Sequence, residues 1–127
     1  MGRMWRNWME LAEEELRQSR EALTVGVYLS VVFSSHQIAE HALKAVHIER
    51  SGGLPPRTHE LIELAESVEA PGNIVRNCQA LNPLYMTSRY PDAANGNPAR
   101  VYSADCAAEL LDLAEEVLNW CSEQLAS

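Results

Sequence analysis

The sequence predicts an all-α protein, an antiparallel up-and-down bundle of about five helices. Apolar residues recur at spacings of three and four along most of the chain, which is the periodicity of a helix with one buried face. Gly, Pro and Asn gather in short clusters between these stretches, and no stretch shows the strict apolar–polar alternation of a half-buried strand. With 127 residues, 46% of them hydrophobic, the chain can bury one core, so we predict a single domain over residues 4–125.

The first helix is predicted over residues 4–23. The apolar side chains that recur at helical spacing are Trp5, Trp8, Ala12, Leu16 and Leu23. Charged residues occupy most of the remaining positions. Gly26 then offers the unusual backbone angle that a tight connection needs. One face of this helix should therefore be buried against the next helix.

The second helix, over residues 28–50, should be the central one. A wide apolar arc faces one way, and a line of His36, Glu40, Lys44 and His47 lies opposite it. Glu40 and Lys44 stand four residues apart, so we predict an ion pair that bridges to a neighbouring helix or subunit. Toward the start of the helix the polar line becomes apolar, so that end should also be covered.

The remaining helices are separated by clear breaks. After a Gly- and Pro-rich loop, Thr58 is predicted to cap a short third helix that runs to about Val68. A fourth helix begins near Asn73, is interrupted at Pro83 and ends near Ser88. Residues 91–102 are predicted as a loop, and Ser103 as the cap of a last helix that ends near residue 125.

Charge and cysteine usage narrow the classes of function. The net charge of −8 argues against broad, sequence-independent binding to a polyanion, although Arg is nine of the ten basic residues and suits a local phosphate or carboxylate site. The three cysteines have no C-x-x-C spacing, which favours free thiols in a reducing compartment. No apolar stretch reaches the about 20 residues of a membrane span, so a cytoplasmic location is expected.

Arg89-Tyr90-Pro91-Asp92 follows the fourth helix and has two interpretations. In the functional one, Arg89 binds a phosphate in bidentate geometry and Tyr90 stacks on a base, with Tyr102 as a second aromatic residue. In the structural one, Pro91 stops the helix, Asp92 bonds loop amides and Arg89 pairs with a carboxylate such as Glu40. Both interpretations remain open at the level of the sequence.

The polar line on the second helix could also be considered as a metal site. His36 and Glu40 are spaced to share a metal ion, but Lys44 one turn later would repel a cation. We therefore expect no metal site and no cofactor. His41 and His59 are interpreted as structural residues.

Several short motifs occur in the order found in one family. They are W-x2-W-x2-L-A-E-E-E-L at residues 5–16, H-Q-I-A-E-H-A-L-K-A at 36–45, P-x-T-H-E-L at 56–61 and S-R-Y-P-D at 88–92. Together they resemble the prokaryotic HEPN domains, named for higher eukaryotes and prokaryotes nucleotide binding. The resemblance implies a helical bundle that pairs as a homodimer, often beside a minimal nucleotidyltransferase in toxin–antitoxin-like systems.

The resemblance also bears on activity. Many members of the superfamily are metal-independent ribonucleases with an Arg-x4-6-His motif, but no His lies between Arg89 and Arg100. We therefore expect a dimeric module that partners a nucleotidyltransferase and binds nucleotide or RNA, with site residues Arg89, Tyr90, Tyr102, Lys44 and Glu40. One alternative is a ribonuclease toxin that uses Arg89 with Tyr90 or Asp92 as catalytic residues. Another is a non-catalytic scaffold for protein interactions.

Overall fold

The structure is a computed structural model that describes residues 4–126, and these residues form an all-α bundle with no strand among them. Five of its helices have seven residues or more: α1 (Met4–Thr24), α2 (Tyr28–Ser51), α3 (Leu61–Ser67), α4 (Gly72–Leu81) and α8 (Ala104–Leu125). Three four-residue helices join them: α5 (Leu84–Thr87), α6 (Pro91–Ala94) and α7 (Pro98–Val101). The predicted all-α bundle of about five helices is confirmed.

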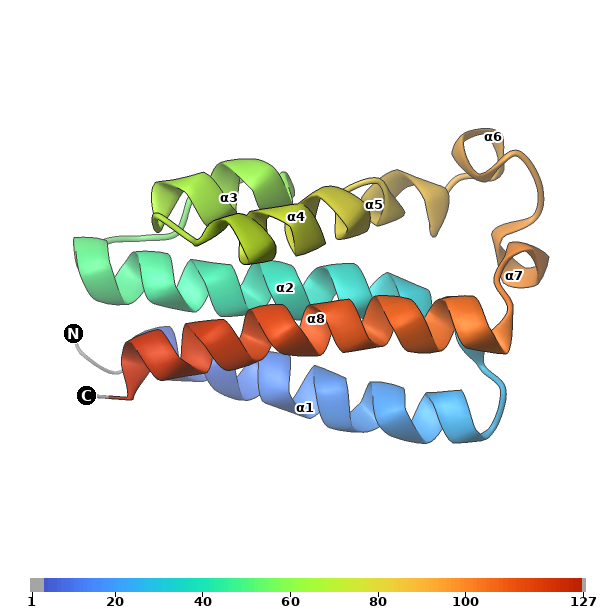
Figure 1. The fold of residues 1–127 in the computed structure, drawn as a ribbon, viewed down its shortest axis with the longest axis horizontal. Helices are drawn as coiled ribbons and strands as arrows, with labels where there is room; N and C mark the ends of the chain where they lie inside the picture. The colour runs from blue at the N-terminus through green and yellow to red at the C-terminus, as the bar shows by residue number, and fades with distance from the viewer. Residues whose placement is uncertain (1–3, 127) are drawn as a thin grey trace.

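The long helices run up and down one common axis, as Figure 1 shows. The chain passes along the axis with α1, returns with α2, passes again with α4 and α5, and returns with α8. The first and last described residues therefore lie at the same end of the bundle, and α6 and α7 lie at the other end. None of the described helices is long and apolar enough to cross a membrane.

Helix α2 is the centre of the bundle, as predicted, and it contacts both α1 and α8 along its length. The small residues Ser35, Ala39 and Ala42 are fully buried, which lets neighbouring helices approach closely. Large side chains such as Ile38 and Leu43 are also fully buried, and each contributes roughly 2 kcal/mol through the hydrophobic effect. The core is therefore aliphatic and is organised around this helix.

The polar line of α2 is mostly buried as well. His36, Glu40 and Lys44 are each at most 6% exposed, so α2 has a second buried face where the sequence suggested a polar one. Tyr85 of α5 and His59 of the segment before α3 contribute to covering this face. Buried charged groups need partners, and Glu40 and Lys44 find one in each other.

The predicted start of the third helix was wrong. Helix α3 begins at Leu61, and the Thr58 hydroxyl accepts a hydrogen bond from the Glu60 amide at 3.0 Å in the preceding turn. The Leu61 amide instead donates to the side-chain carbonyl oxygen of Asn82, at 2.8 Å. The cap thus comes from the interruption between α4 and α5, a partner 21 residues away that local sequence cannot reveal.

The segment predicted as a loop over residues 91–102 contains α6 and α7. Each of these short helices begins with a proline, whose fixed backbone angle favours a first helical turn. Asn95 ends α6 in the left-handed conformation at φ 56°, and the Asn97 side chain accepts from the Ala99 amide to cap α7. The proline content was interpreted only as helix-breaking, which is why the prediction was wrong here.

Two other predicted boundaries are confirmed. Helix α4 ends at Leu81 and α5 begins at Leu84, so the interruption falls at Asn82 and Pro83. Ser103 caps α8, because its hydroxyl accepts from the Cys106 amide at 3.1 Å. Cys78, Cys106 and Cys121 are free thiols in α4 and α8.

Candidate functional site

Four side chains from different parts of the chain form a stack near the end of α5. The Arg89 guanidinium carbon lies 4.1 Å from the centre of the Phe33 ring and 4.0 Å from that of Tyr85. The His59 ring lies 4.2 Å from the Tyr85 ring, tilted by only 19°. His59 and Arg89 cannot share one face of Tyr85 at these distances, so the order is Phe33, Arg89, Tyr85, His59. We call these four residues the stacked array.

Arg89 is held in the stacked array by two aromatic rings. Its guanidinium makes cation–π contacts with Phe33 and Tyr85, and Nη1 donates to the Tyr85 carbonyl oxygen at 2.8 Å. The structural interpretation in which Arg89 pairs with Glu40 is wrong, because the Glu40 carboxylate is paired with Lys44 and His59. The contacts orient the guanidinium without neutralising its charge.

Glu40 joins the stacked array to the core. Its Oε1 accepts from His59 Nδ1 at 3.0 Å, and its Oε2 accepts from Lys44 Nζ at 3.0 Å, so the predicted Glu40–Lys44 pair is confirmed. Burial alone would raise the pKa of Glu40, but the hydrogen bonds from His59 and Lys44 hold that pKa below its ordinary value. The carboxylate is therefore ionised and fixes the orientation of the His59 ring.

His36 lies next to both Glu40 and His59 and is fully buried. Its Nε2 is 2.9 Å from the His59 carbonyl oxygen, and because a carbonyl only accepts, Nε2 carries the proton. The other nitrogen, Nδ1, is 3.7 Å from Glu40 Oε1 and has no hydrogen-bond partner. Burial lowers the pKa of His36 to about 4, so the ring is neutral at pH 7.

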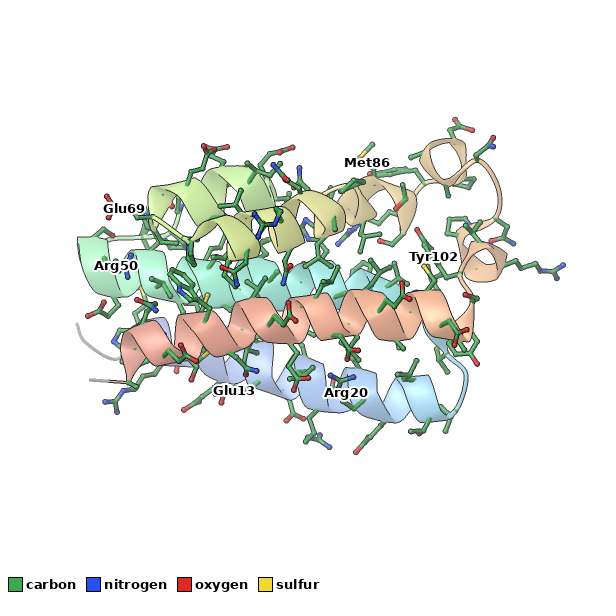
Figure 2. All side chains as sticks on the ribbon, in the orientation of Figure 1. Glu13, Arg20, Arg50, Glu69, Met86 and Tyr102 are labelled. Atoms are coloured by element: carbon green, nitrogen blue, oxygen red, sulfur yellow. The ribbon has the colours of Figure 1, made fainter. Side chains whose placement is uncertain are left out.

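The stacked array ends in a surface hollow with a volume of about 370 Å³. The hollow is lined by Arg57, Thr58, His59, Glu60, Asn82, Tyr85 and Met86. The His59 side chain is 54% exposed there, and Met86 is 50% exposed, projecting outward from α5 in Figure 2. The hollow thus offers an aromatic ring, an apolar side chain, a cation and a carboxylate to a ligand.

The structure brings together only part of the predicted site. Arg89 belongs to the stacked array and Glu40 lies beneath it, but Lys44 is 6% exposed and lies over the Trp8 ring, behind Glu40. Tyr90 is exposed at the start of α6, and Asp92 is exposed within it.

Tyr102 serves a different contact. Its hydroxyl donates to Thr87 Oγ1 at 2.9 Å, which fastens the link between α7 and α8 to the end of α5. Arg89 makes its cation–π contacts with Phe33 and Tyr85, whereas Tyr90 and Tyr102 were predicted to stack on a base.

Sequence reasoning missed most of the ring contacts. Phe33 and Tyr85 received no role, and His59 was interpreted as structural. The contacts that join them link positions far apart in the chain, such as Glu40 and His59, and no local pattern encodes them. The one available clue was the Arg57-Thr58-His59 run placed immediately before a helix, which brings a cation and an imidazole to one bend.

Comparisons with known proteins agree with this fold. The family model described as "HEPN domain" matches residues 5–124. The crystal structure of TT1696 from Thermus thermophilus is similar at a TM-score of 0.86 and 36% identity, covering 98% of this chain and 99% of that one. The crystal structure of ST0689, an archaeal HEPN homologue, is similar at a TM-score of 0.80 and 31% identity, covering 94% of this chain and 96% of that one. No curated protein matches the chain. The chain therefore belongs to the HEPN domain family.

Proposed function

We propose that this protein is a dimeric HEPN module that binds RNA or a nucleotide at the hollow beside the stacked array. The observation that carries the proposal is the exposed His59 ring, which ends a continuous stack and opens into a hollow large enough for a nucleotide base. Bases stack on exposed aromatic and imidazole faces with a gain of about 1–3 kcal/mol each. In this proposal a base extends the stack beyond His59.

The phosphate contacts are assigned to two arginines. Arg57 lines the hollow and is exposed, and Arg89 is preoriented by the rings of Phe33 and Tyr85. Guanidinium groups bind phosphate oxygens in pairs, and a group that is already oriented loses less side-chain entropy on binding. A net charge of −8 over the whole chain favours a small, focused site of this kind over a broad binding surface.

The first test is binding of labelled single-stranded RNA in EDTA by the full chain and by two matched variants. Arg89→Ala removes the oriented guanidinium and should weaken binding about tenfold, the value of one charge-assisted contact. Arg17→Ala is the control, because Arg17 bonds only Glu14 and Glu21 on the exposed side of α1. Equal binding by all three folded proteins would rule out the assignment of phosphate to Arg89.

The partners in this proposal follow from the family. The protein would act as a homodimer with a minimal nucleotidyltransferase, in a toxin–antitoxin-like pair. Sedimentation of the purified chain tests the dimer, and coexpression with a nucleotidyltransferase encoded beside it tests the pairing. A monomer that does not copurify with that enzyme would contradict this part of the proposal and leave the RNA site to be judged separately.

A second candidate function, metal-independent RNA cleavage, is favoured by the contact between His59 and Glu40. His59 Nδ1 donates to the carboxylate at 3.0 Å, which leaves Nε2 as the base on a ring that lines the hollow. That nitrogen would take the proton of a 2′-hydroxyl while O2′ attacks the phosphorus and the bond to the 5′-oxygen breaks, with water giving the departing 5′-oxygen its proton. Among the described residues, the side chains of Tyr90 and Asp92, the catalytic partners suggested by the sequence, take part in none of the ring and cation–π contacts of the stacked array.

Cleavage is tested in the same RNA mixtures. If the second candidate holds, the wild type yields fragments ending in a 2′,3′-cyclic phosphate in EDTA, and His59→Ala yields none while still folding. Intact RNA bound by the wild type would favour the binding module alone. Fragments of equal yield from wild type and His59→Ala would exclude His59 as the base.

A further inference from the structure

Glu60 has no role in phosphate binding, yet it lines the hollow beside Arg57 and His59. A carboxylate repels phosphate, so this part of a nucleic-acid site must face a group that donates hydrogen bonds. Resting on the proposed function, we propose that the hollow selects guanine, with Glu60 as the residue that determines the specificity. The ligand is a guanine base, either in single-stranded RNA or in a free guanine nucleotide.

The Glu60 carboxylate is held in one orientation. The Leu61 amide donates to one side-chain atom of Asn82 at 2.8 Å, so that atom is the carbonyl oxygen, and the Asn82 amide nitrogen must point the other way. That nitrogen donates to Glu60 Oε2 at 2.9 Å. The Glu60 backbone is fixed as well, because its amide donates to the Thr58 hydroxyl at 3.0 Å.

The chemistry of this carboxylate matches one base. A carboxylate accepts through two oxygens side by side, and guanine presents two adjacent donors, N1–H and the N2 amino group, on its Watson–Crick edge. Adenine and cytosine place an acceptor beside their amino group, and uracil flanks its single N–H with two carbonyl oxygens. Only guanine can therefore satisfy both oxygens without placing an acceptor against a negative charge.

The rest of the hollow suits the flat part of the base. The free face of the His59 ring continues the stack, since its other face is covered by Tyr85 at 4.2 Å. Met86 is one of the large apolar side chains left exposed, and it lines the same hollow, where it can contact the ring of a base. A volume of about 370 Å³ accommodates one base and leaves the phosphate outside, toward Arg57.

The test measures how tightly the full chain binds three short single-stranded RNAs. They differ at one position, which carries guanine, inosine or adenine. Guanine is expected to bind about tenfold more tightly than adenine, with inosine between them because it lacks the N2 amino group. Glu60→Gln should abolish this preference, since an amide offers one acceptor and one donor. Glu63→Gln, which changes an exposed carboxylate of α3 that lies outside the hollow, should keep it.

The outcomes separate this inference from the proposed function. Tight RNA binding without preference for guanine, or a preference that survives in Glu60→Gln, would overturn the inference and leave the RNA site intact. A wild-type protein that binds none of the RNAs would overturn both the inference and the proposed function. Competition by guanosine monophosphate distinguishes the two sources: strong competition identifies the free nucleotide as the ligand, and weak competition identifies guanine within RNA.

Discussion

The buried ion pair of α2 gives the sharpest prediction for stability. Lys44 is the only lysine of the chain, and its ammonium lies 3.0 Å from the carboxylate of Glu40, with both side chains less than a tenth exposed. Lys44→Met keeps the aliphatic volume but leaves Glu40 buried with His59 as its remaining partner. Removing one member of a buried pair costs 3–5 kcal/mol in other proteins, so with one hydrogen bond retained we expect a loss of about 3 kcal/mol.

Urea unfolding at neutral pH, followed by circular dichroism, measures this loss. The double variant Lys44→Met/Glu40→Gln removes both charges and should be more stable than Lys44→Met alone by at least about 1 kcal/mol. Arg17→Met is the control, because the Arg17 side chain is 58% exposed and exposed ion pairs of this kind add little to stability. A cost for Lys44→Met equal to that of the control would refute the account of the buried pair.

Three further predictions concern pH, capping and thiol reactivity. Because the pKa of His36 falls from 6.5 to about 4 on folding, stability present above pH 6.5 should be lost as pH falls toward 4, by up to about 3 kcal/mol. In thermal melts, the melting temperature of His36→Gln should fall less between pH 6.5 and pH 4 than that of the wild type. Ser103→Ala should cost about 1 kcal/mol, because the cap of α8 is removed; an unchanged melting temperature would contradict this. Iodoacetamide should modify Cys106 first, since burial raises the pKa of Cys78 to about 12; mass spectrometry of the native protein that found Cys78 labelled equally fast would contradict the packing.

The long helices could be predicted because their information is local. Apolar spacing located α1, α2 and α8 within a residue or two of their ends, and Pro83 located the interruption after α4. Where a distant partner determines the boundary, prediction was wrong. The start of α3 depends on Asn82, which lies 21 residues further along the chain.

The candidate site was predictable only in part for the same reason. Arg89 stood out because it belongs to a recognisable run of residues at the end of a helix. Its partners Phe33 and Tyr85 come from α2 and α5, and ordinary aromatic residues on helices are usually core residues, so nothing in their neighbourhoods indicated a stack. His59 joins them only because α2 and the segment before α3 meet at Glu40.

The most direct test of the central claim is a titration of the protein with short single-stranded RNA, followed by nuclear magnetic resonance of the histidine rings. His59 is 54% exposed at the hollow, whereas His41 is 12% exposed and held by Glu15 of α1 at 2.6 Å. The account predicts that the His59 ring resonances shift in proportion to bound RNA while those of His41 stay in place. RNA binding that leaves His59 unmoved would contradict it, because the ligand would then lie away from the stacked array.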